Sequence, residues 1–288
     1  MLEIICNPIA GYGRGEKVGQ SVAEALHQKG ILFQLEHTQS PGHATQLARK
    51  AAVSGVSGVI SIGGDGTARE VARGLIGTDI PLGIIPGGTG NDFIKALGLS
   101  KDPLSALDHI LSHPALPTDV GEVNGKLFLN EIGTGFDVSV LDYSLQAKKY
   151  CRGILPYLYG VLRTMFHFSS IPITFTVDGG GEQTRDAFCI GLANGTTFGG
   201  GFPIAPGARL DDGQLDLVII NKIRRGDLIS RLRGLIKGEV LNFPETEHLL
   251  GREFTFSTPG MRVNIDGEVV AADTVTARVL PGALKIRR

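Results

Sequence analysis

The stretch "VISIGGDGTAREV", from Val59 to Val71, decides the fold of the first part of the chain, because an apolar run passes through a glycine-rich turn into a helical pattern. Gly63, Gly64 and Gly66 surround Asp65 in that turn. Glycines let another group approach the backbone closely, and the unpaired N–H groups at a helix N-terminus favour an anion. The stretch therefore predicts a phosphate-binding loop.

Two side chains refine this prediction. Thr67 can add a hydroxyl donor, whereas Asp65 repels a bare phosphate, which favours a Mg²⁺ ion or its waters between the two. The alternative is a tight turn between strand and helix, in which the glycines serve only the turn and Asp65 is the N-cap of the helix.

The first hundred residues alternate between apolar runs and segments of helical period. The helical segments include residues 43–55, and the runs predict strands over residues 2–6, 32–38, 58–62 and 82–86. Such a series builds a Rossmann-like α/β domain with a mostly parallel sheet, and its ligands bind beyond the carboxyl ends of the strands.

A second glycine cluster, "IIPGGTGNDF" at Ile84 to Phe93, follows the next predicted strand and again opens a helix. Loops on adjacent strand-helix units converge at one edge of a parallel sheet. Neither cluster fits the Walker pattern GxxxxGK[ST] or the dinucleotide pattern GxGxxG.

After about Pro117 the pattern changes to closely spaced strands with Gly, Asn and Asp turns, which predicts a mainly antiparallel β-sandwich. Two helical stretches, about 142–168 and 225–237, interrupt it. We expect an α/β domain over residues 1–120 and a β-sandwich domain over residues 121–288, whose last strand can return to the first domain.

The charge balance excludes a nucleic-acid-binding footprint spread over the whole protein, since 28 Lys and Arg face 29 Asp and Glu. The N-terminus does not resemble a signal peptide and no run resembles a membrane span, so we expect a soluble cytoplasmic protein. Cys6, Cys151 and Cys189 lie far apart without zinc-site spacing and are interpreted as free thiols.

The two glycine motifs, "GGDGT" at Gly63–Thr67 and "PGGTGNDF" at Pro86–Phe93, resemble those of the diacylglycerol kinase catalytic domain family, which includes bacterial lipid kinases and the sphingosine and ceramide kinases. The similarity continues through "NPIAG" at Asn7–Gly11, residues 194–220 and "DGE" at Asp266–Glu268. These blocks follow the family's order along almost the whole chain.

The resemblance implies that the α/β domain over residues 1–120 binds ATP and that the β-sandwich domain over residues 121–288 binds the lipid substrate, with the active site in the cleft between them. It implies a catalytic, magnesium-associated Asp65, a general base at Glu268, and a structural Mg²⁺ held by the Asp212 side chain and the carbonyls of Arg209 and Gln214. The residues that it implies for ATP are Asn7, Pro8, Gly11, Thr38, Gly63, Gly64, Asp65, Gly66, Thr67, Ala68, Arg69 and Thr89.

Local patterns offer simpler interpretations of two of these sites. Glu268 follows an Asp-Gly pair between alternating apolar residues, which is typical of a hairpin turn. "LDDGQLD" at Leu210–Asp216 has the composition of a turn between strands.

The chain departs from the family pattern at two positions. Arg69 stands where the family usually has Asn, so an Asn-mediated nucleotide contact is in doubt, although a guanidinium can meet phosphate. The basic residue after the first motif is displaced to Arg14, which is either a phosphate-facing cation or a solvated charge.

Two basic and apolar segments suit reversible docking on an anionic bilayer. No Asp or Glu occurs from Tyr143 to Val177, where Lys148, Lys149, Arg152 and Arg163 lie among apolar residues. The second segment carries Lys222, Arg224, Arg225, Arg231, Arg233 and Lys237, with Asp227 opposing them. The alternative is a pair of amphipathic helices with solvated basic faces.

These observations predict an ATP- and Mg²⁺-dependent lipid kinase that phosphorylates a hydroxyl of diacylglycerol or a related membrane lipid. It would contact an anionic membrane transiently and peripherally. The sequence does not decide between a monomer and a homodimer. The alternatives are an NAD kinase, a nucleotide- or lipid-binding homologue without catalysis and, on the α/β pattern alone, a dinucleotide-dependent oxidoreductase.

Overall fold

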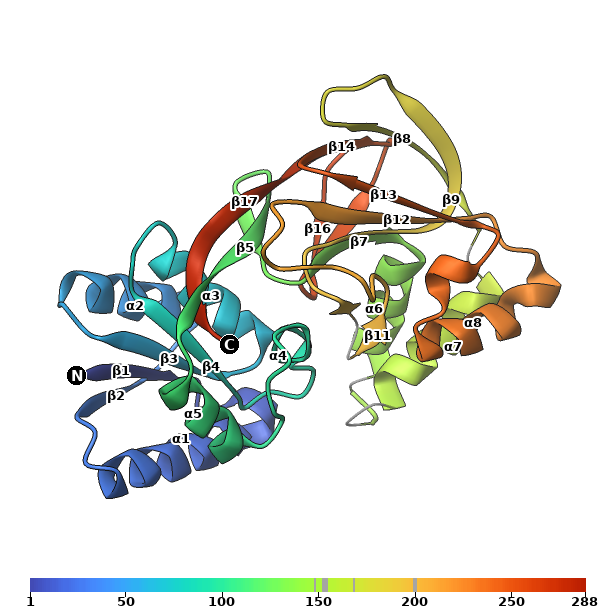
Figure 1. Ribbon diagram of the computed structural model, residues 1–288. Helices are drawn as coiled ribbons and strands as arrows, with labels where there is room; N and C mark the ends of the chain where they lie inside the picture. Colours follow the sequence, from blue (N-terminus) through green and yellow to red (C-terminus); the bar gives the residue numbers. More distant parts are fainter. Residues whose placement is uncertain (148, 152–154, 168, 199–200) are drawn as a thin grey trace. The chain divides into compact units, whose positions relative to one another are not determined.

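The computed structural model describes residues 1–147, 149–151, 155–167, 169–198 and 201–288 (Figure 1). The chain forms two compact units, which comprise residues 1–120 with 281–288 (unit 1) and residues 121–280 (unit 2). Unit 1 is an α/β unit with parallel strands and unit 2 is mainly antiparallel, so the predicted fold class is confirmed.

The sheet of unit 1 has the order β2-β1-β3-β4, and all of these neighbours are parallel. The last strand of the chain, β17 (Thr274–Arg287), adds to it because Lys285 and Ile286 pair in parallel with β4. The other elements of unit 1 are β1 (Leu2–Cys6), α1 (Ala10–Gln28), β2 (Phe33–His37), α2 (His43–Val53), β3 (Gly58–Gly63), α3 (Asp65–Leu75), β4 (Pro81–Pro86), α4 (Asp92–Ala96) and α5 (Pro103–Ser112).

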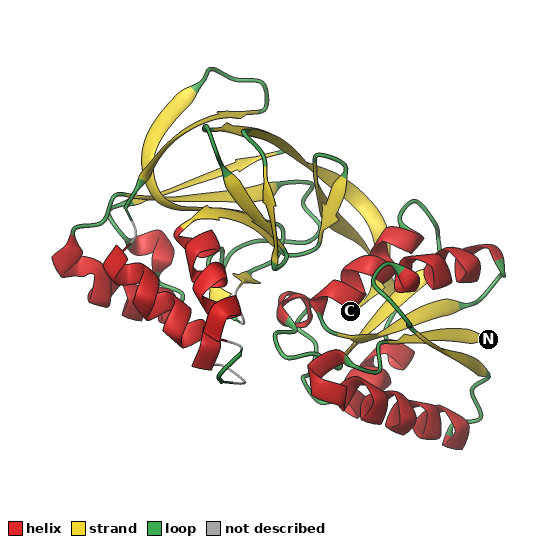
Figure 2. Cartoon of the chain, turned by 180° about the vertical axis from the view of Figure 1, so that it is seen from behind, coloured by secondary structure: helices red, strands yellow, loops and turns green. Residues whose placement is uncertain are grey.

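Helices cover both faces of this sheet (Figure 2). Alternate residues of the central strands, such as Ile4 and Ile62, share a core with Val22 and Leu26 of α1 and Leu107 of α5. Every residue of β3 is buried, as expected for a central strand of a parallel sheet. The loops that follow β1, β2, β3 and β4 therefore all emerge at the same edge.

Unit 2 is built of antiparallel strands with its helices gathered on one side of them (Figure 2). The main path of its sheet is β16-β15-β7-β9-β8-β14-β17, and β12 joins β9 to β13. Its elements are β5 (Ala115–Val123, which begins in unit 1), β6 (Lys126–Phe128), β7 (Glu131–Gly135), α6 (Phe136–Ala147), α7 (Leu155–His167), β8 (Ile171–Val177), β9 (Gln183–Ala193), β10 (Thr197–Phe198), β11 (Phe202–Pro203), β12 (Leu215–Asn221), η1 (Arg225–Asp227), α8 (Leu228–Lys237), η2 (Val240–Asn242), β13 (Thr246–Gly251), β14 (Glu253–Ser257), β15 (Arg262–Ile265) and β16 (Glu268–Ala271).

The helical part of unit 2 begins earlier than the sequence indicates. The stretch predicted as helical from about residue 142 contains part of α6 and all of α7, and α6 already begins at Phe136. Gly135 adopts a φ of 88°, so β7 turns into the helix without a loop. No described helix is both long enough and apolar enough to cross a membrane.

The core of unit 2 demands a glycine at one strand position. Phe128 is fully buried and its ring lies where a Cβ on Gly121 would stand. The two residues are paired across β5 and β6. Only a residue without a side chain at position 121 leaves space for the Phe128 ring.

Replacing Gly121 with Ala should destabilise unit 2 by about 1–3 kcal/mol, because the new methyl group overpacks a buried aromatic side chain. Thermal unfolding of the variant measures this loss. Gly181→Ala is the matched control, since Gly181 is exposed and no atom lies within 4 Å of the place where its methyl group would stand. A Gly121→Ala melting temperature equal to that of the control would contradict the packing argument.

Candidate active site

The two glycine loops of unit 1 are joined through one carbonyl group. The backbone N–H groups of Gly87 and Gly88 both donate to the carbonyl oxygen of Gly63, at 2.7 and 2.9 Å. Gly63 is the last residue of β3, and Gly87 directly follows β4. The predicted convergence of the two loops is therefore confirmed, and it is a direct backbone contact.

The glycines of these loops serve two different purposes. A Cβ on Gly88 would overlap the Cα of Gly64, and one on Gly63 would lie 2.5 Å from the Thr67 hydroxyl oxygen. Gly88 must therefore be glycine so that the two loops can pack, and Gly63 so that the Thr67 side chain can fold back over it. Gly66 differs, because it is exposed and no atom lies within 4 Å of its Cβ position. Its backbone is accessible at the first turn of α3.

The first loop of the chain packs against the same place. The Asn7 side-chain amide donates to the Thr67 hydroxyl oxygen at 3.1 Å, and the Asn7 backbone N–H donates to Ile62. Gly11, Tyr12 and Gly13 all adopt left-handed conformations, which distort the start of α1. Thr67 is buried and accepts a hydrogen bond from Asn7, so its hydroxyl proton can be donated elsewhere.

The Asp65 side chain reaches from the first glycine loop to the second. One of its carboxylate oxygens accepts the backbone N–H of Phe93 at 3.0 Å, in the first turn of α4. The other oxygen lies 3.1 Å from the Cβ position of Gly90. The Asp65 carboxylate thus satisfies a helix N-terminus with one oxygen and faces the second loop with the other.

The remaining residues predicted to contact ATP also lie in unit 1. Thr38 directly follows β2, where its N–H donates to Cys6, and Thr89 is exposed in the second glycine loop. Ala68 is buried, and its N–H donates to Gly64 within the helix. Pro8 is half-buried beside Asn7.

The two positions that depart from the family pattern are both accessible. Arg69 is half-buried and stands four residues after Asp65 in α3, so the two residues lie on one face of the helix. Arg14 is exposed. The pKa of Asp102 is lowered mainly by hydrogen bonds from Ser105, and the positive charge of Arg14 adds to this effect. Arg14 therefore lies within electrostatic reach of the α5 N-terminus.

Glu268 lies in unit 2 and follows the predicted Asp-Gly hairpin turn. Ile265 pairs with Glu268 across β15 and β16, and Asp266 and Gly267 between them have φ angles of 45° and 91°. Two positive φ angles identify a type I′ turn. The Glu268 side chain is 52% exposed, and its carboxylate lies 3.4 Å from the Lys126 ammonium group.

Sequence reasoning missed the role of Asp266 beside it. Its carboxylate accepts the backbone N–H groups of Leu129, Asn130 and Glu131, at 2.7, 3.0 and 3.0 Å. These bonds attach the hairpin to the segment between β6 and β7. The Asp-Gly pair signals a turn, but no local pattern indicates which distant amides an Asp will bind.

Asp137 was also missed. It is 5% exposed, and one carboxylate oxygen accepts a hydrogen bond from the Asn264 side-chain amide at 2.9 Å. Burial raises the pKa of Asp137 to about 6, while the hydrogen bond from Asn264 opposes this rise. The side-chain oxygen of Asn264 in turn accepts the N–H of Gly267 at 2.8 Å.

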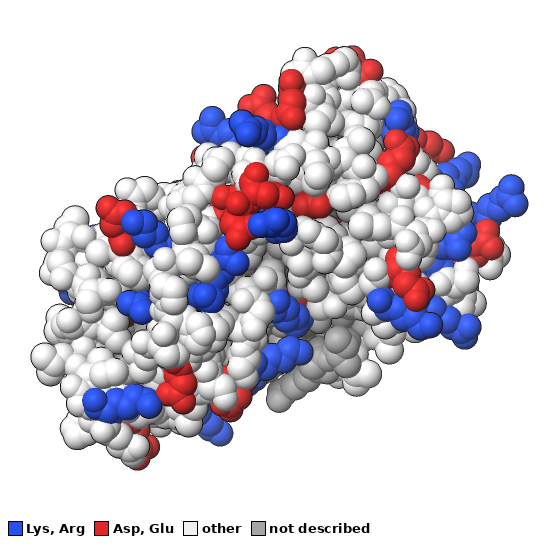
Figure 3. Space-filling view, viewed as in Figure 1, with Lys and Arg blue, Asp and Glu red and all other residues white. Residues whose placement is uncertain are grey.

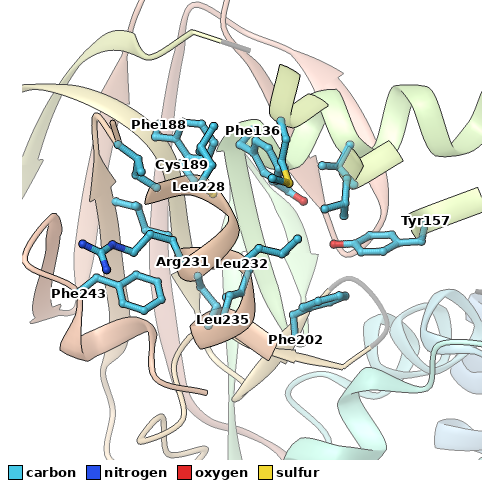
Figure 4. Close-up of a pocket in the computed structure, with 17 residues that line it drawn as sticks. Phe136, Tyr157, Phe188, Cys189, Phe202, Leu228, Arg231, Leu232, Leu235 and Phe243 are labelled. Atoms are coloured by element: carbon cyan, nitrogen blue, oxygen red, sulfur yellow. The ribbon is translucent and has the colours of Figure 1, made fainter. Parts of the chain in front are cut away.

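Asp137 also lines an apolar pocket of unit 2. The pocket has a cavity volume of about 50 Å³ and is partly open to solvent. Figure 4 shows Phe136, Phe188 and Cys189 along one wall and side chains of α8 along another, with the Tyr157 hydroxyl pointing inward. Arg231 lines it too, but its guanidinium is paired with Glu245 at 2.8 Å.

The turn predicted to hold a structural metal is stabilised by a hydrogen bond to the side chain of Asp212, one of its own residues. The Asp212 carboxylate accepts the N–H of Gln214 at 3.0 Å, and Arg209 pairs with Asp211. Within the described part of the chain, no three His, Cys, Asp or Glu side chains gather as metal ligands. A cation here would therefore need backbone carbonyls and waters in addition to Asp212.

Comparison with known proteins assigns the chain to a family. The family model described as diacylglycerol kinase catalytic domain matches residues 1–123. A second model, the YegS C-terminal NAD kinase beta sandwich-like domain, matches residues 130–288. A YegS-like protein of Pseudomonas fluorescens, named a probable lipid kinase, is 33% identical over 93% of this chain and 89% of its own. The chain belongs to the diacylglycerol kinase catalytic domain family.

Other relatives agree with this assignment. The diacylglycerol kinase of Bacillus subtilis is 33% identical over 92% of this chain and 88% of its own. The crystal structure of a candidate diacylglycerol kinase from Bacillus anthracis, 27% identical, superposes with a TM-score of 0.83 over 99% of this chain and 94% of that one. The family predicted from the motifs is confirmed, and the relatives support the predicted enzyme class, a lipid kinase.

Proposed function

We propose that the protein is an ATP- and Mg²⁺-dependent kinase that phosphorylates a hydroxyl group of diacylglycerol or a related membrane lipid. The observation that carries the proposal is the contact between the two glycine loops at Gly63, in a chain of the diacylglycerol kinase family. The relatives named diacylglycerol kinase support the choice of acceptor.

The nucleotide phosphates are proposed to accept a hydrogen bond from the backbone N–H of Gly66. Its N–H lies at the N-terminus of α3, where the helix dipole favours an anion, and the space at its Cβ position is open. Thr67 can donate its hydroxyl proton, because its oxygen already accepts from Asn7. Gly63, Gly64 and Gly88 contribute by holding the loops together.

The residues near Asp65 suit a Mg²⁺ ion. A carboxylate oxygen that faces the second glycine loop is a hard ligand of the kind Mg²⁺ prefers. When bound with ATP, the ion would neutralise charge on the phosphate oxygens. A further Mg²⁺ is proposed at Asp212 with the carbonyls of Arg209 and Gln214, where the turn supplies one carboxylate.

Glu268 is proposed as the general base. The acceptor hydroxyl oxygen forms its bond to the γ-phosphorus while the bond from that phosphorus to the ADP oxygen breaks, and the hydroxyl proton passes to the Glu268 carboxylate. The exposed position of Glu268 next to a turn leaves its carboxylate accessible to a lipid hydroxyl. The apolar pocket suits an acyl chain, since its lining is mostly aromatic and aliphatic.

Unit 2 is proposed to dock on an anionic membrane through α7 and α8, which would make the protein a peripheral, cytoplasmic enzyme. The two helices pack together through Val161, Met165, Leu228 and Leu232. They expose apolar side chains, including Leu158, Leu162 and Ile236. Figure 3 shows Lys and Arg gathered on this part of unit 2, with fewer Asp and Glu. Lys148 and Arg152 of the predicted basic segment lie outside the described residues.

An NAD kinase is the second candidate, because the model that matches residues 130–288 is described as NAD kinase beta sandwich-like. The motif "PGGTGNDF" favours the lipid kinase, as it continues the lipid kinase pattern. The acceptor separates the two: phosphorylation of NAD, without phosphorylation of any component of a total lipid extract, would select the NAD kinase. Nucleotide binding without transfer to either acceptor would select a homologue without catalysis.

Replacing Gly66 with Ala should weaken ATP binding about tenfold, or about 1.4 kcal/mol, because the methyl group stands beside the N–H proposed to meet phosphate. Titration calorimetry with a non-hydrolysable ATP analogue and Mg²⁺ measures the affinity. The melting temperature should not fall, since the Cβ position is open. Gly88→Ala should instead lower the melting temperature, because its methyl group overlaps Gly64. Unchanged affinity in Gly66→Ala would count against this phosphate position.

Replacing Glu268 with Gln should reduce kcat for lipid phosphorylation by about 10²-fold or more, because a general base contributes on the order of 10²–10⁴. ATP affinity and melting temperature should stay near wild type, since an exposed pair with Lys126 contributes little stability. Glu253→Gln is the matched control, an exposed Glu that also begins a strand of unit 2. Full activity of Glu268→Gln would reject the base assignment.

Replacing Leu158 and Leu162 together with Ser should lower binding to vesicles that contain anionic lipid about tenfold, because two apolar contacts with the bilayer are lost. Co-sedimentation at low and physiological salt measures the partitioning. Leu32→Ser with Val53→Ser is the matched control, since these side chains are 78% and 87% exposed in unit 1. Equal binding by both double variants would contradict docking through α7.

A further inference from the structure

A chain of hydrogen bonds lies behind the hairpin that carries Glu268. The Asn264 side chain uses both ends of its amide: its nitrogen donates to Asp137, and its oxygen accepts the N–H of Gly267. Asp137 stands in the first turn of α6, Asn264 in β15 and Gly267 in the turn. The chain therefore links a helix to the backbone of the residue directly before Glu268.

Asp137 determines which way the Asn264 amide faces. An ionised carboxylate only accepts hydrogen bonds, so it requires the NH₂ end of Asn264. The oxygen end must then face the turn, where the Gly267 N–H needs an acceptor. A flipped amide would set its oxygen against the carboxylate and its NH₂ group against an N–H group. The orientation of Asn264 thus depends on Asp137.

The position of Asp137 is costly for folding. Its carboxyl group is buried in the wall of an apolar pocket, where an ionised group is disfavoured. The opposing influence on its pKa is the single hydrogen bond from Asn264. A residue that breaks the rule for buried positions is expected at a functional site.

The turn is fixed from two directions. The Asp266 carboxylate is bound to the backbone of residues 129–131, and the Gly267 N–H is bound to Asn264. Both central residues of the turn are thus held by groups outside the turn itself. Such support matters for a catalytic group, because a misplacement of about 1 Å can cost on the order of 10² in rate.

We propose that Asp137 and Asn264 are positioning residues for phosphoryl transfer, which hold the Asp266–Gly267 turn in the geometry that places the Glu268 carboxylate against the acceptor hydroxyl. This inference rests on the role of Glu268 in the proposed function. It predicts that the two residues act on turnover at saturating substrates and leave ATP affinity unchanged.

The test is an exchange of the two side chains. Asn264→Asp sets two carboxylates against each other. Their repulsion should move the acceptor oxygen away from the Gly267 N–H and lower kcat for lipid phosphorylation about tenfold or more. Asp137→Asn replaces a group that only accepts with an amide that can present either end, so it should loosen the Asn264 orientation and lower kcat about three- to tenfold. In the double variant, the new amide at position 137 can donate to the new carboxylate at position 264. The second oxygen of that carboxylate accepts from Gly267, so kcat should return to within about threefold of wild type.

Asp142→Asn is the matched control. Asp142 also joins α6 to β15, through a two-pronged ion pair with the Arg262 guanidinium, but it does not touch the turn. Its kcat should stay within about twofold of wild type, since surface ion pairs contribute little. Melting temperatures and the KM for ATP are measured for every variant, and hydrogen exchange of the Gly267 amide reports its hydrogen bond directly. This amide should exchange faster in Asn264→Asp and be protected again in the double variant.

Three results would overturn the inference: wild-type kcat in Asn264→Asp, no recovery in the double variant, or losses of kcat that merely follow the melting temperature. Glu268→Gln, assayed in parallel, separates the positioning role from the proposed function. If Glu268→Gln is inactive while Asn264→Asp is fully active, the positioning role fails and the proposed function stands. If Glu268→Gln is active, or wild-type protein phosphorylates no lipid, the base assignment fails and the positioning role falls with it.

Discussion

The organisation of unit 1 depends on the carbonyl group of Gly63, which accepts the N–H groups of both Gly87 and Gly88. A parallel sheet brings the ends of its strands to one edge, but it does not by itself fix the loops beyond them. Here the last residue of one strand holds the loop that follows its neighbour. Asp65 adds a second link, since its carboxylate accepts the first-turn N–H of Phe93 in α4. These hydrogen bonds consequently fix the two loops relative to each other.

This contact changes the interpretation of the glycine-rich sequence. The sequence alone predicts that the glycines around Asp65 make room for a ligand. In the structure, Gly63 makes room for the Thr67 side chain, Gly88 makes room for the other loop, and Gly66 is the residue whose Cβ position is open. Packing and ligand binding therefore both select glycine in one short motif, at different positions. A sequence pattern cannot separate these demands, because both produce the same residue.

Much of the fold follows from local pattern. The strands of unit 1 and the Asp-Gly hairpin before Glu268 agree with the predicted positions, because the period of apolar residues and the chemistry of turns act over a few residues. The contacts that support the site do not follow from such patterns. Asp266 binds amides 135 to 137 residues away, and Asp137 and Asn264 are 127 residues apart. Only the folded chain brings these groups together.

Exposed groups that are available to a substrate follow from local sequence patterns, whereas the buried groups that fix their positions depend on long-range contacts. Gly66, in the first turn of α3, and Glu268, the first residue of β16, are both exposed. An exposed side chain on a two-residue turn would by itself sample many positions, and each would contribute little to catalysis. Buried polar residues restrict that freedom, but they do so at a cost in stability, as the raised pKa of Asp137 shows. An apolar residue at position 137 would suit the pocket better and would leave Asn264 without its fixed orientation. The buried carboxylate is therefore best understood through the turn that it supports.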